Sequence, residues 1–233
     1  GPLLIVAGVG TGKTTVIIEG VKRAPETSIL ICAFSKIIQE ELRARIGKDY
    51  PHIEAKTLHS VGYQCVRLYR ERIKVEFNST RADNLALNVC GAHAPDAIKR
   101  LVSKLHTKGR EIAPHAIKLG DLTDIAINFD CEPDEMWAKS GFPLEYVEAR
   151  ALEAMVLAAN VQSGETIDGS DMIFLPVRNG WLSGQFDLVV VDEAQDMTTA
   201  QLEIAQGVLR KNGRIAIVGD DHQAIFGFRG ADS

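Results

Sequence analysis

The chain has 233 residues, enough for one domain or for one domain with an insertion. Hydrophobic residues make up 45% and charged residues 24%, without a biased tract, so a disordered or fibrous protein is excluded. The 26 basic and 31 acidic residues give a formal net charge of −5, which does not indicate a nucleic-acid partner. It does not exclude one either, because such binding depends on where the positive charges lie.

The four cysteines are far apart and form no C-x-x-C pair: Cys32, Cys65, Cys90 and Cys131. Neither a zinc site nor a disulfide framework is expected from this spacing, and a reduced, cytoplasmic setting fits best. No run of 18 apolar residues occurs, so we expect no membrane span and no membrane partner.

Four short apolar runs predict buried parallel strands, because they are rich in Val, Ile and Leu and do not alternate with polar residues. The runs are Leu3–Val6, Ile29–Ala33, Leu188–Val191 and Ile215–Val218. Helical patterns follow the first two, over Thr14–Val21 and Ile37–Ile46. Strands that alternate with helices predict an α/β domain with a doubly wound parallel sheet.

The middle of the chain, residues 64–176, has helical patterns instead. One amphipathic helix is predicted from Ile98, Leu101, Val102 and Leu105, and another from Leu144, Val147, Ala151, Leu152 and Met155, with Pro143 near its first turn. Turn signals at Lys108-Gly109, Glu132-Pro133 and Ser163-Gly164 separate the helical pieces. We therefore predict an α/β domain over 1–63 and 177–233, interrupted by a helical subdomain over 64–176.

A glycine-rich segment, Ala7–Thr14, follows the first predicted strand and opens a helix. Glycines let successive backbone N–H groups curl around an anion, and the helix N-terminus adds its dipole. In such a loop the Lys13 side chain reaches the β- and γ-phosphates, and the Thr14 hydroxyl is a Mg²⁺ ligand. A strand-to-helix turn with a chance lysine is the alternative. The pattern favours nucleoside triphosphate binding by Gly8, Gly10, Thr11, Gly12, Lys13, Thr14 and Thr15.

Two carboxylates, Asp192 and Glu193, come directly after a predicted strand. Ligands of doubly wound sheets bind at the carboxyl ends of the strands, so this pair and the glycine-rich loop are expected to meet. Asp192 would then be a Mg²⁺ partner, and Glu193 the base that polarises the attacking water. An isolated acidic pair would favour a solvated loop. With a phosphate loop in the same chain, the pair predicts hydrolysis.

The motifs together resemble those of the UvrD-like superfamily 1 DNA helicases. The first reads A-G-V-G-T-G-K-T from Ala7, the second D-E-A-Q-D from Asp192, and the third V-G-D-D-H-Q-A-I-F-G-F-R-G-A-D from Val218. Weaker similarities lie at Ala33-Phe34-Ser35-Lys36 with Glu41 and Arg45, at Thr57-Leu58-His59-Ser60, and at Ile167-Asp168-Gly169-Ser170-Asp171-Met172. The resemblance implies a RecA-like P-loop fold, ATP and Mg²⁺ as ligands, and single-stranded DNA and a duplex junction as partners.

Site roles also follow from this resemblance. Gln223 would contact the γ-phosphate and act with Lys13 and Glu193 in catalysis, and Asp220 would support the site. The single-strand groove would be formed by Phe34, Thr57, His59, Phe226 and Phe228, where aromatic faces stack on bases regardless of sequence. For each phenylalanine the alternative is burial in the core, and for His59 a structural histidine.

The chain also departs from the family pattern. Thr15 stands where relatives often have an arginine that packs on adenine. The adenine-reading segment would precede Gly1, and the later motifs of the second motor domain would follow Ser233. We therefore expect the N-terminal portion of a 3′–5′ motor that needs its second domain in cis. A nuclease-coupled translocase, an RNA-directed motor and a non-catalytic nucleotide-binding module stay open as alternatives.

A basic stretch in the predicted insertion has two interpretations. It comprises Lys99, Arg100, Lys104, Lys108, Arg110 and Lys118. By the family resemblance it would touch duplex DNA through phosphate contacts. The alternative, which we favour, is a solvated helix face opposite the apolar stripe that begins at Ile98.

Overall fold

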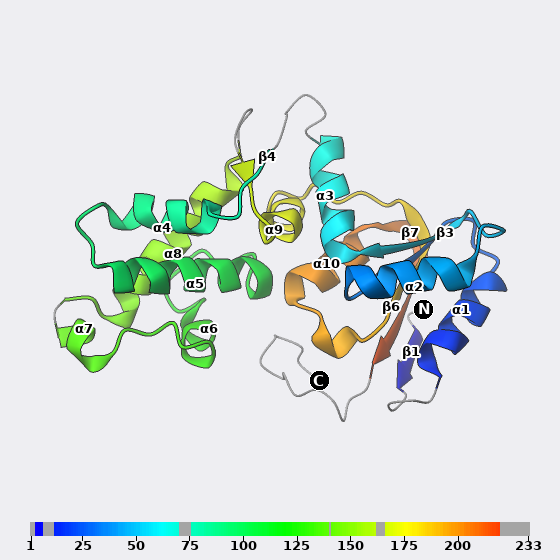
Figure 1. The fold of residues 1–233 in the computed structure, drawn as a ribbon, viewed down its shortest axis with the longest axis horizontal. Coiled ribbons are helices and arrows are strands. Elements are labelled where there is room, and N and C mark those ends of the chain that lie inside the picture. The colour runs from blue at the N-terminus through cyan, green and yellow to red at the C-terminus, as the bar shows by residue number, and fades with distance from the viewer. Residues whose placement is uncertain (1–2, 7–11, 70–75, 140, 162–165, 220–233) are drawn as a thin grey trace. The chain divides into compact units, whose positions relative to one another are not determined.

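The computed structural model describes residues 3–6, 12–69, 76–139, 141–161 and 166–219 (Figure 1). The chain divides into two compact units. Unit 1 comprises Gly1–Cys65 and Leu182–Ser233, and unit 2 comprises Val66–Trp181. In the described residues, no helix is both long and apolar enough to cross a bilayer.

Unit 1 is built on a five-stranded parallel sheet with the strand order β1-β7-β6-β2-β3. The strands are β1 (Leu3–Val6), β2 (Ile29–Ala33), β3 (Ile53–Thr57), β6 (Phe186–Val191) and β7 (Leu209–Gly219). The predicted α/β class and all four predicted strands are confirmed. The structure adds β3, whose buried and half-buried residues alternate and which therefore lacks a continuous apolar run.

Helices of unit 1 follow the strands closely. They are α1 (Lys13–Lys22), α2 (Lys36–Ile46), α10 (Thr199–Gly207) and the short 3-10 helix η1 (Ala194–Asp196). α3 (Leu58–Tyr69) begins in this unit. Ser35 is the N-cap of α2, and its side chain accepts a hydrogen bond from the Ile38 backbone N–H. Thr198 is the N-cap of α10 and forms a capping box with Gln201.

The central strands β2 and β6 are buried on both faces of the sheet. α1 and α2 cover one face with Ile17, Ile18, Val21, Leu42 and Ile46, which pack on Ile29, Ile31, Ala33, Leu188, Val190 and Val218. The residues between them, such as Leu30, Val189 and Val191, are equally inaccessible, and α10 packs on β6 and β7. Burial on two faces explains why these strands are continuous apolar runs.

Unit 2 is mainly helical. Its helices are α4 (Arg81–Cys90), α5 (Asp96–Ile112), α6 (Thr123–Asn128), α7 (Glu135–Lys139), α8 (Leu144–Ala159) and α9 (Asp171–Arg178). Two short strands, β4 (Glu76–Phe77) and β5 (Thr166–Ile167), pair in parallel. α4, α5 and α8 pack on one another. The two predicted amphipathic helices are confirmed as α5 and α8, although Leu101 is only half-buried.

The turn predicted at Lys108-Gly109 is wrong, because α5 continues through both residues to Ile112. A Cβ on Gly109 would lie 2.8 Å from Met155 Sδ of α8 and 3.0 Å from Leu122 Cδ2. Glycine is present here because neighbouring side chains approach the helix backbone closely, and not because the chain turns. The predicted break at Glu132-Pro133 does lie between helices.

A buried charge cluster joins three segments of unit 2. The Arg110 side chain, fully inaccessible, donates hydrogen bonds to Asp168 Oδ1 and Oδ2 at 2.9 Å and to Asp171 Oδ1 at 2.6 Å. Arg81 Nε lies 2.9 Å from Asp171 Oδ2. The predicted solvated basic face therefore excludes Arg110, which is a core residue, whereas Arg100 and Lys104 are exposed.

Candidate active site

The N-terminus of α1 places Lys13 at the carboxyl end of the sheet. Gly12 has a positive φ of 80°, a conformation that glycine adopts without strain, and it directly precedes the helix. The Lys13 side chain is only 8% exposed, and its Nζ lies 3.2 Å from Glu193 Oε2. Residues 180 positions apart in the sequence thus form an ion pair beside a helix N-terminus.

The acidic pair follows the end of β6. Asp192 is buried, with 7% of its surface exposed, and its Oδ1 accepts a hydrogen bond from the Glu193 backbone N–H at 3.0 Å. Glu193 has φ 51° and ψ 48°, in the left-handed region that costs a non-glycine residue energy. This backbone directs the chain from β6 into η1. Strain concentrated at a cluster of charged side chains is typical of functional sites.

Burial raises the pKa of Asp192, and the neighbouring charge of Glu193 raises it further. A hydrogen bond with the Thr14 side chain and the positive charge of Lys13 act in the opposite direction. The structure therefore brings together Lys13, Thr14, Asp192 and Glu193, with one cation facing two carboxylates. Such a site has an excess of negative charge that a bound cation would neutralise.

The oxygen donors at this site fit Mg²⁺. A hydroxyl from Thr14 and a buried carboxylate from Asp192 lie next to each other, and hard oxygen ligands suit this ion. Within the described ranges, no cluster of three or more His, Cys, Asp or Glu side chains could hold a metal by itself. Mg²⁺ is commonly bound by one or two protein groups together with substrate phosphates, so a full protein cage is not required.

Gln195 is a member of this site that sequence reasoning did not single out. Its Nε2 donates a hydrogen bond of 2.7 Å to Glu193 Oε2, the same oxygen that faces Lys13. Gln195 is the middle residue of η1, two positions after the strained Glu193 backbone. Its place in the D-E-A-Q-D motif was the available signal.

The predicted groove residues of unit 1 lie near strand ends. Phe34 follows β2 and is 48% exposed, so the alternative of core burial is wrong for this residue. Thr57 ends β3, and its Oγ1 accepts a hydrogen bond from the Ser60 backbone N–H. His59 is half-buried in the first turn of α3. Gly8, Gly10, Thr11, Asp220, Gln223, Phe226 and Phe228 lie outside the described residues.

Thr15 has a cationic neighbour that sequence reasoning did not assign to the site. The Arg45 Nη2 atom of α2 donates a hydrogen bond to Thr15 Oγ1 at 2.7 Å. A guanidinium group is therefore held at the first turn of α1. Arg45 also forms an ion pair with Glu41, with its Nη1 3.5 Å from Glu41 Oε1.

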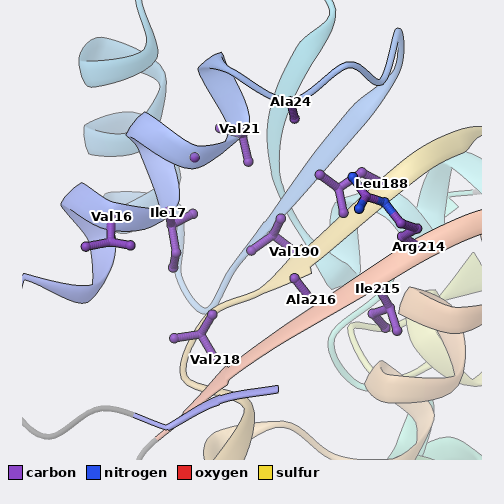
Figure 2. A pocket seen from close by; sticks show the side chains of 11 residues that line it. Val16, Ile17, Val21, Ala24, Leu188, Val190, Arg214, Ile215, Ala216 and Val218 are labelled. Atoms are coloured by element: carbon purple, nitrogen blue, oxygen red, sulfur yellow. The ribbon is translucent and has the colours of Figure 1, made fainter. Parts of the chain in front are cut away.

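An apolar cavity of about 300 Å³ lies between α1 and strands β6 and β7 (Figure 2). Figure 2 shows Val16, Ile17 and Val21 of α1 facing Leu188, Val190 and Ala216 of the strands. Among the residues that the structure describes, no acidic side chain lines it, and neither Lys13 nor Glu193 takes part. The cavity is therefore distinct from the charged site at the strand ends.

Comparison with known proteins agrees with the resemblance of the motifs. Relatives include the ATP-dependent DNA helicases PcrA of Staphylococcus epidermidis, 26% identical, and of Leuconostoc citreum, 28% identical. Each alignment covers 100% of this chain but only 33% and 32% of the respective relative, so the chain spans about a third of their length. The family model for the UvrD/REP helicase N-terminal domain matches residues 1–233. The chain therefore belongs to the UvrD/REP helicase N-terminal domain family.

Proposed function

We propose that this chain is the ATP-binding and ATP-hydrolysing part of a DNA helicase or translocase that moves 3′–5′ on single-stranded DNA. The relatives named above are ATP-dependent DNA helicases. The observation on which the proposal rests most is the ion pair of 3.2 Å between Lys13 and Glu193, with Asp192 buried beside it. A phosphate-binding lysine and a candidate base at one strand edge suit hydrolysis better than binding alone.

Lys13 would exchange its ion pair with Glu193 for contacts with the nucleotide. A triphosphate at the N-terminus of α1 would attract Lys13, because phosphate oxygens offer more negative charge than one carboxylate. Glu193 would then lose its cation and be free to accept a proton from the attacking water. Gly12 and the glycine-rich residues before it, with Thr11 and Thr15, would form the rest of the nucleotide site. Gln223 would sense the γ-phosphate.

Mg²⁺ would be held by Thr14 and Asp192 together with the nucleotide, and it would neutralise charge on the phosphates. Asp192 suits this role because its carboxylate is buried beside Glu193 and is incompletely balanced by Lys13. The burial also restricts the carboxylate to one position, since Thr14 and the Glu193 backbone N–H both contact it.

The DNA-facing residues would extend from neighbouring strands of the same sheet. We assign Phe34, Thr57, His59, Phe226 and Phe228 to contacts with single-stranded DNA, with Phe34 stacking on a base. The exposed ring of Phe34 directly after β2 supports this assignment. Because β2 is hydrogen-bonded to β6, a change at Glu193 has a short path to Phe34.

Residues 64–176 would be a helical subdomain inserted into the motor domain of 1–63 and 177–233. A second motor domain would be supplied in cis by the longer polypeptide, since the relatives are about three times as long as this chain. Arginines from such a partner domain can raise phosphoryl-transfer rates by several orders of magnitude. The chain alone would therefore hydrolyse ATP slowly.

The test is ATP hydrolysis by the full-length polypeptide with and without single-stranded DNA. Glu193→Gln should lower kcat by about 10²–10⁴-fold while ATP still binds, because a general base is lost and the shape is kept. Glu40→Gln, a change at an exposed position of α2, is the matched control and should leave kcat unchanged. An unaltered rate in Glu193→Gln would refute the catalytic assignment. A rate indifferent to DNA would refute the motor assignment.

A further inference from the structure

We propose that Gln195 is a positioning residue that holds the Glu193 carboxylate in place when Lys13 leaves it for the nucleotide. The proposal rests on the function proposed above and adds a residue to its hydrolytic step. Gln195 touches neither the nucleotide nor the water in this role, but acts through Glu193. Three observations support it: a shared acceptor atom, a strained backbone and a close approach at the end of β7.

The first observation is that one oxygen has two donors. Glu193 Oε2 lies 3.2 Å from Lys13 Nζ and accepts the hydrogen bond from Gln195 Nε2 at 2.7 Å. When Lys13 turns to a phosphate, the amide donor remains. An amide has no net charge, so it fixes the direction of the carboxylate without neutralising it as an ammonium does. A base held in this way stays reactive toward water.

The second observation is that Glu193 needs such a restraint. Its side chain is 35% exposed, and its backbone is in the left-handed region at φ 51°. A half-exposed carboxylate on a strained turn would populate several rotamers once its ion pair is lost. Catalysis by a general base requires a narrow range of positions relative to the water.

The third observation explains what holds Gln195 itself. A Cβ built on Gly219, the last residue of β7, would lie 2.9 Å from Gln195 Oε1. The amide group thus lies between the backbone at the end of β7 and the Glu193 carboxylate. Glycine at position 219 leaves the space that the amide occupies, and a methyl group there would force the amide to move. The end of β7 therefore controls the direction of the base through Gln195.

The proposal is tested with DNA-stimulated ATP hydrolysis by the full-length polypeptide. Gln195→Met keeps the length of the side chain and removes its donor. We expect kcat to fall by about 10- to 100-fold, the effect of one hydrogen bond to a charged group. The KM for ATP and the affinity for a non-hydrolysable ATP analogue should change by less than about twofold. Loss of both kcat and nucleotide affinity would overturn the proposal, as would an unchanged kcat.

Gln195→Glu gives a readout that a purely structural residue would not affect. The substitution keeps the size of the side chain but places a second acceptor beside Glu193 Oε2, so the base is repelled instead of held. We expect kcat to fall at least as far as in Gln195→Met, while the KM for ATP changes by less than about twofold. A kcat equal to that of the unsubstituted polypeptide would contradict the proposal even if Gln195→Met failed to fold.

Gly219→Ala tests the contact from the other side. It should lower kcat with little change in KM, and the double variant with Gln195→Met should be no worse than Gln195→Met alone. Gly20→Ala, where an added methyl group meets no atom within 4 Å, is the matched control. Additive losses would overturn the link between Gly219 and Gln195. If Glu193→Gln itself is fully active, the proposed function fails instead, and the two failures are distinguished.

Discussion

Replacement of Arg110 by methionine should destabilise unit 2 strongly. The variant keeps a side chain of similar length but removes the hydrogen bonds to Asp168 and Asp171, which are 7% and 0% exposed. Two carboxylates would then face the single guanidinium of Arg81, and one negative charge would be buried without compensation. Removing one partner from a buried ionic group typically costs about 3–5 kcal/mol.

Urea unfolding followed by tryptophan fluorescence would measure this loss. Both tryptophans of the sequence, at positions 137 and 181, belong to unit 2, and Trp181 is buried, so its emission reports on this unit. For an m-value of about 1.5 kcal/mol/M, the expected loss lowers the midpoint by about 2–3 M. Arg100→Met, at an exposed position of the same helix, is the matched control and should change stability by less than about 0.5 kcal/mol.

A second substitution tests the charge argument directly. In Arg110→Met/Asp168→Asn the remaining Arg81 and Asp171 again balance, with Arg81 Nε 2.9 Å from Asp171 Oδ2. The amide oxygen introduced at position 168 can still accept the hydrogen bond that the Asp171 backbone N–H now donates to Asp168 Oδ1. We expect the double variant to regain much of the lost stability. If Arg110→Met is no less stable than Arg100→Met, or if the double variant is worse than the single one, the reasoning is refuted.

Three further predictions concern other parts of the molecule. Asp192→Asn should abolish Mg²⁺-dependent hydrolysis yet raise the Tm at neutral pH. Burial raises the pKa of Asp192 in the folded state above its value in the unfolded chain, so the stability of the folded state falls as the pH rises from the unfolded to the folded pKa, and the charged carboxylate destabilises the fold at neutral pH. A lower Tm of the variant would contradict this. Burial lowers the pKa of His106 to about 4, so as the pH falls the unfolded chain binds a proton before the folded protein does. The free energy of unfolding, measured by urea titration, should therefore fall by up to about 3 kcal/mol from pH 6.5 to pH 4. His106→Gln should not show this loss. Phe34→Ala should weaken binding of single-stranded DNA by about 1–3 kcal/mol in a fluorescence anisotropy titration, whereas Ile37→Ala, at a position 79% exposed in the first turn of α2, should not.

Much of the α/β unit was predictable from the sequence because its strands are buried on both faces. Leu188–Val191 and Ile29–Ala33 stand out as apolar runs for this physical reason. β3 was missed because Ile53 and Ala55 face the core while Glu54 and Lys56 are half-buried, and a strand this short with alternating residues resembles a loop. The apolar runs alone predicted an α/β sheet, and the motifs were needed as well to predict the RecA-like fold.

The helical unit was harder to predict, because local signals there have more than one structural cause. Gly109 is of a residue type common in turns, but it is a glycine because Met155 approaches the helix backbone closely. Arg110 is of a residue type common on solvated helix faces. Its partners Asp168 and Asp171 are about 60 residues away in the sequence, and no periodicity indicates that they bind it. At the active site the residue types were predictable from the motifs, but the role of Gln195 depends on where its amide points.

The central strand β6 has an aspartate near each end, and the number of residues in the strand fixes the distance between the two side chains. At its start Asp187 accepts hydrogen bonds from Thr27 and Arg210, and just beyond its end Asp192 contacts Thr14. Side chains alternate between the faces of a strand, so deletion of one residue between these ends would turn Asp192 away from the helix that bears Lys13. Such a deletion would leave the hydrophobic composition nearly intact and still disable the site. Natural variation in chain length should therefore occur in the loop over 181–185 and be absent from β6.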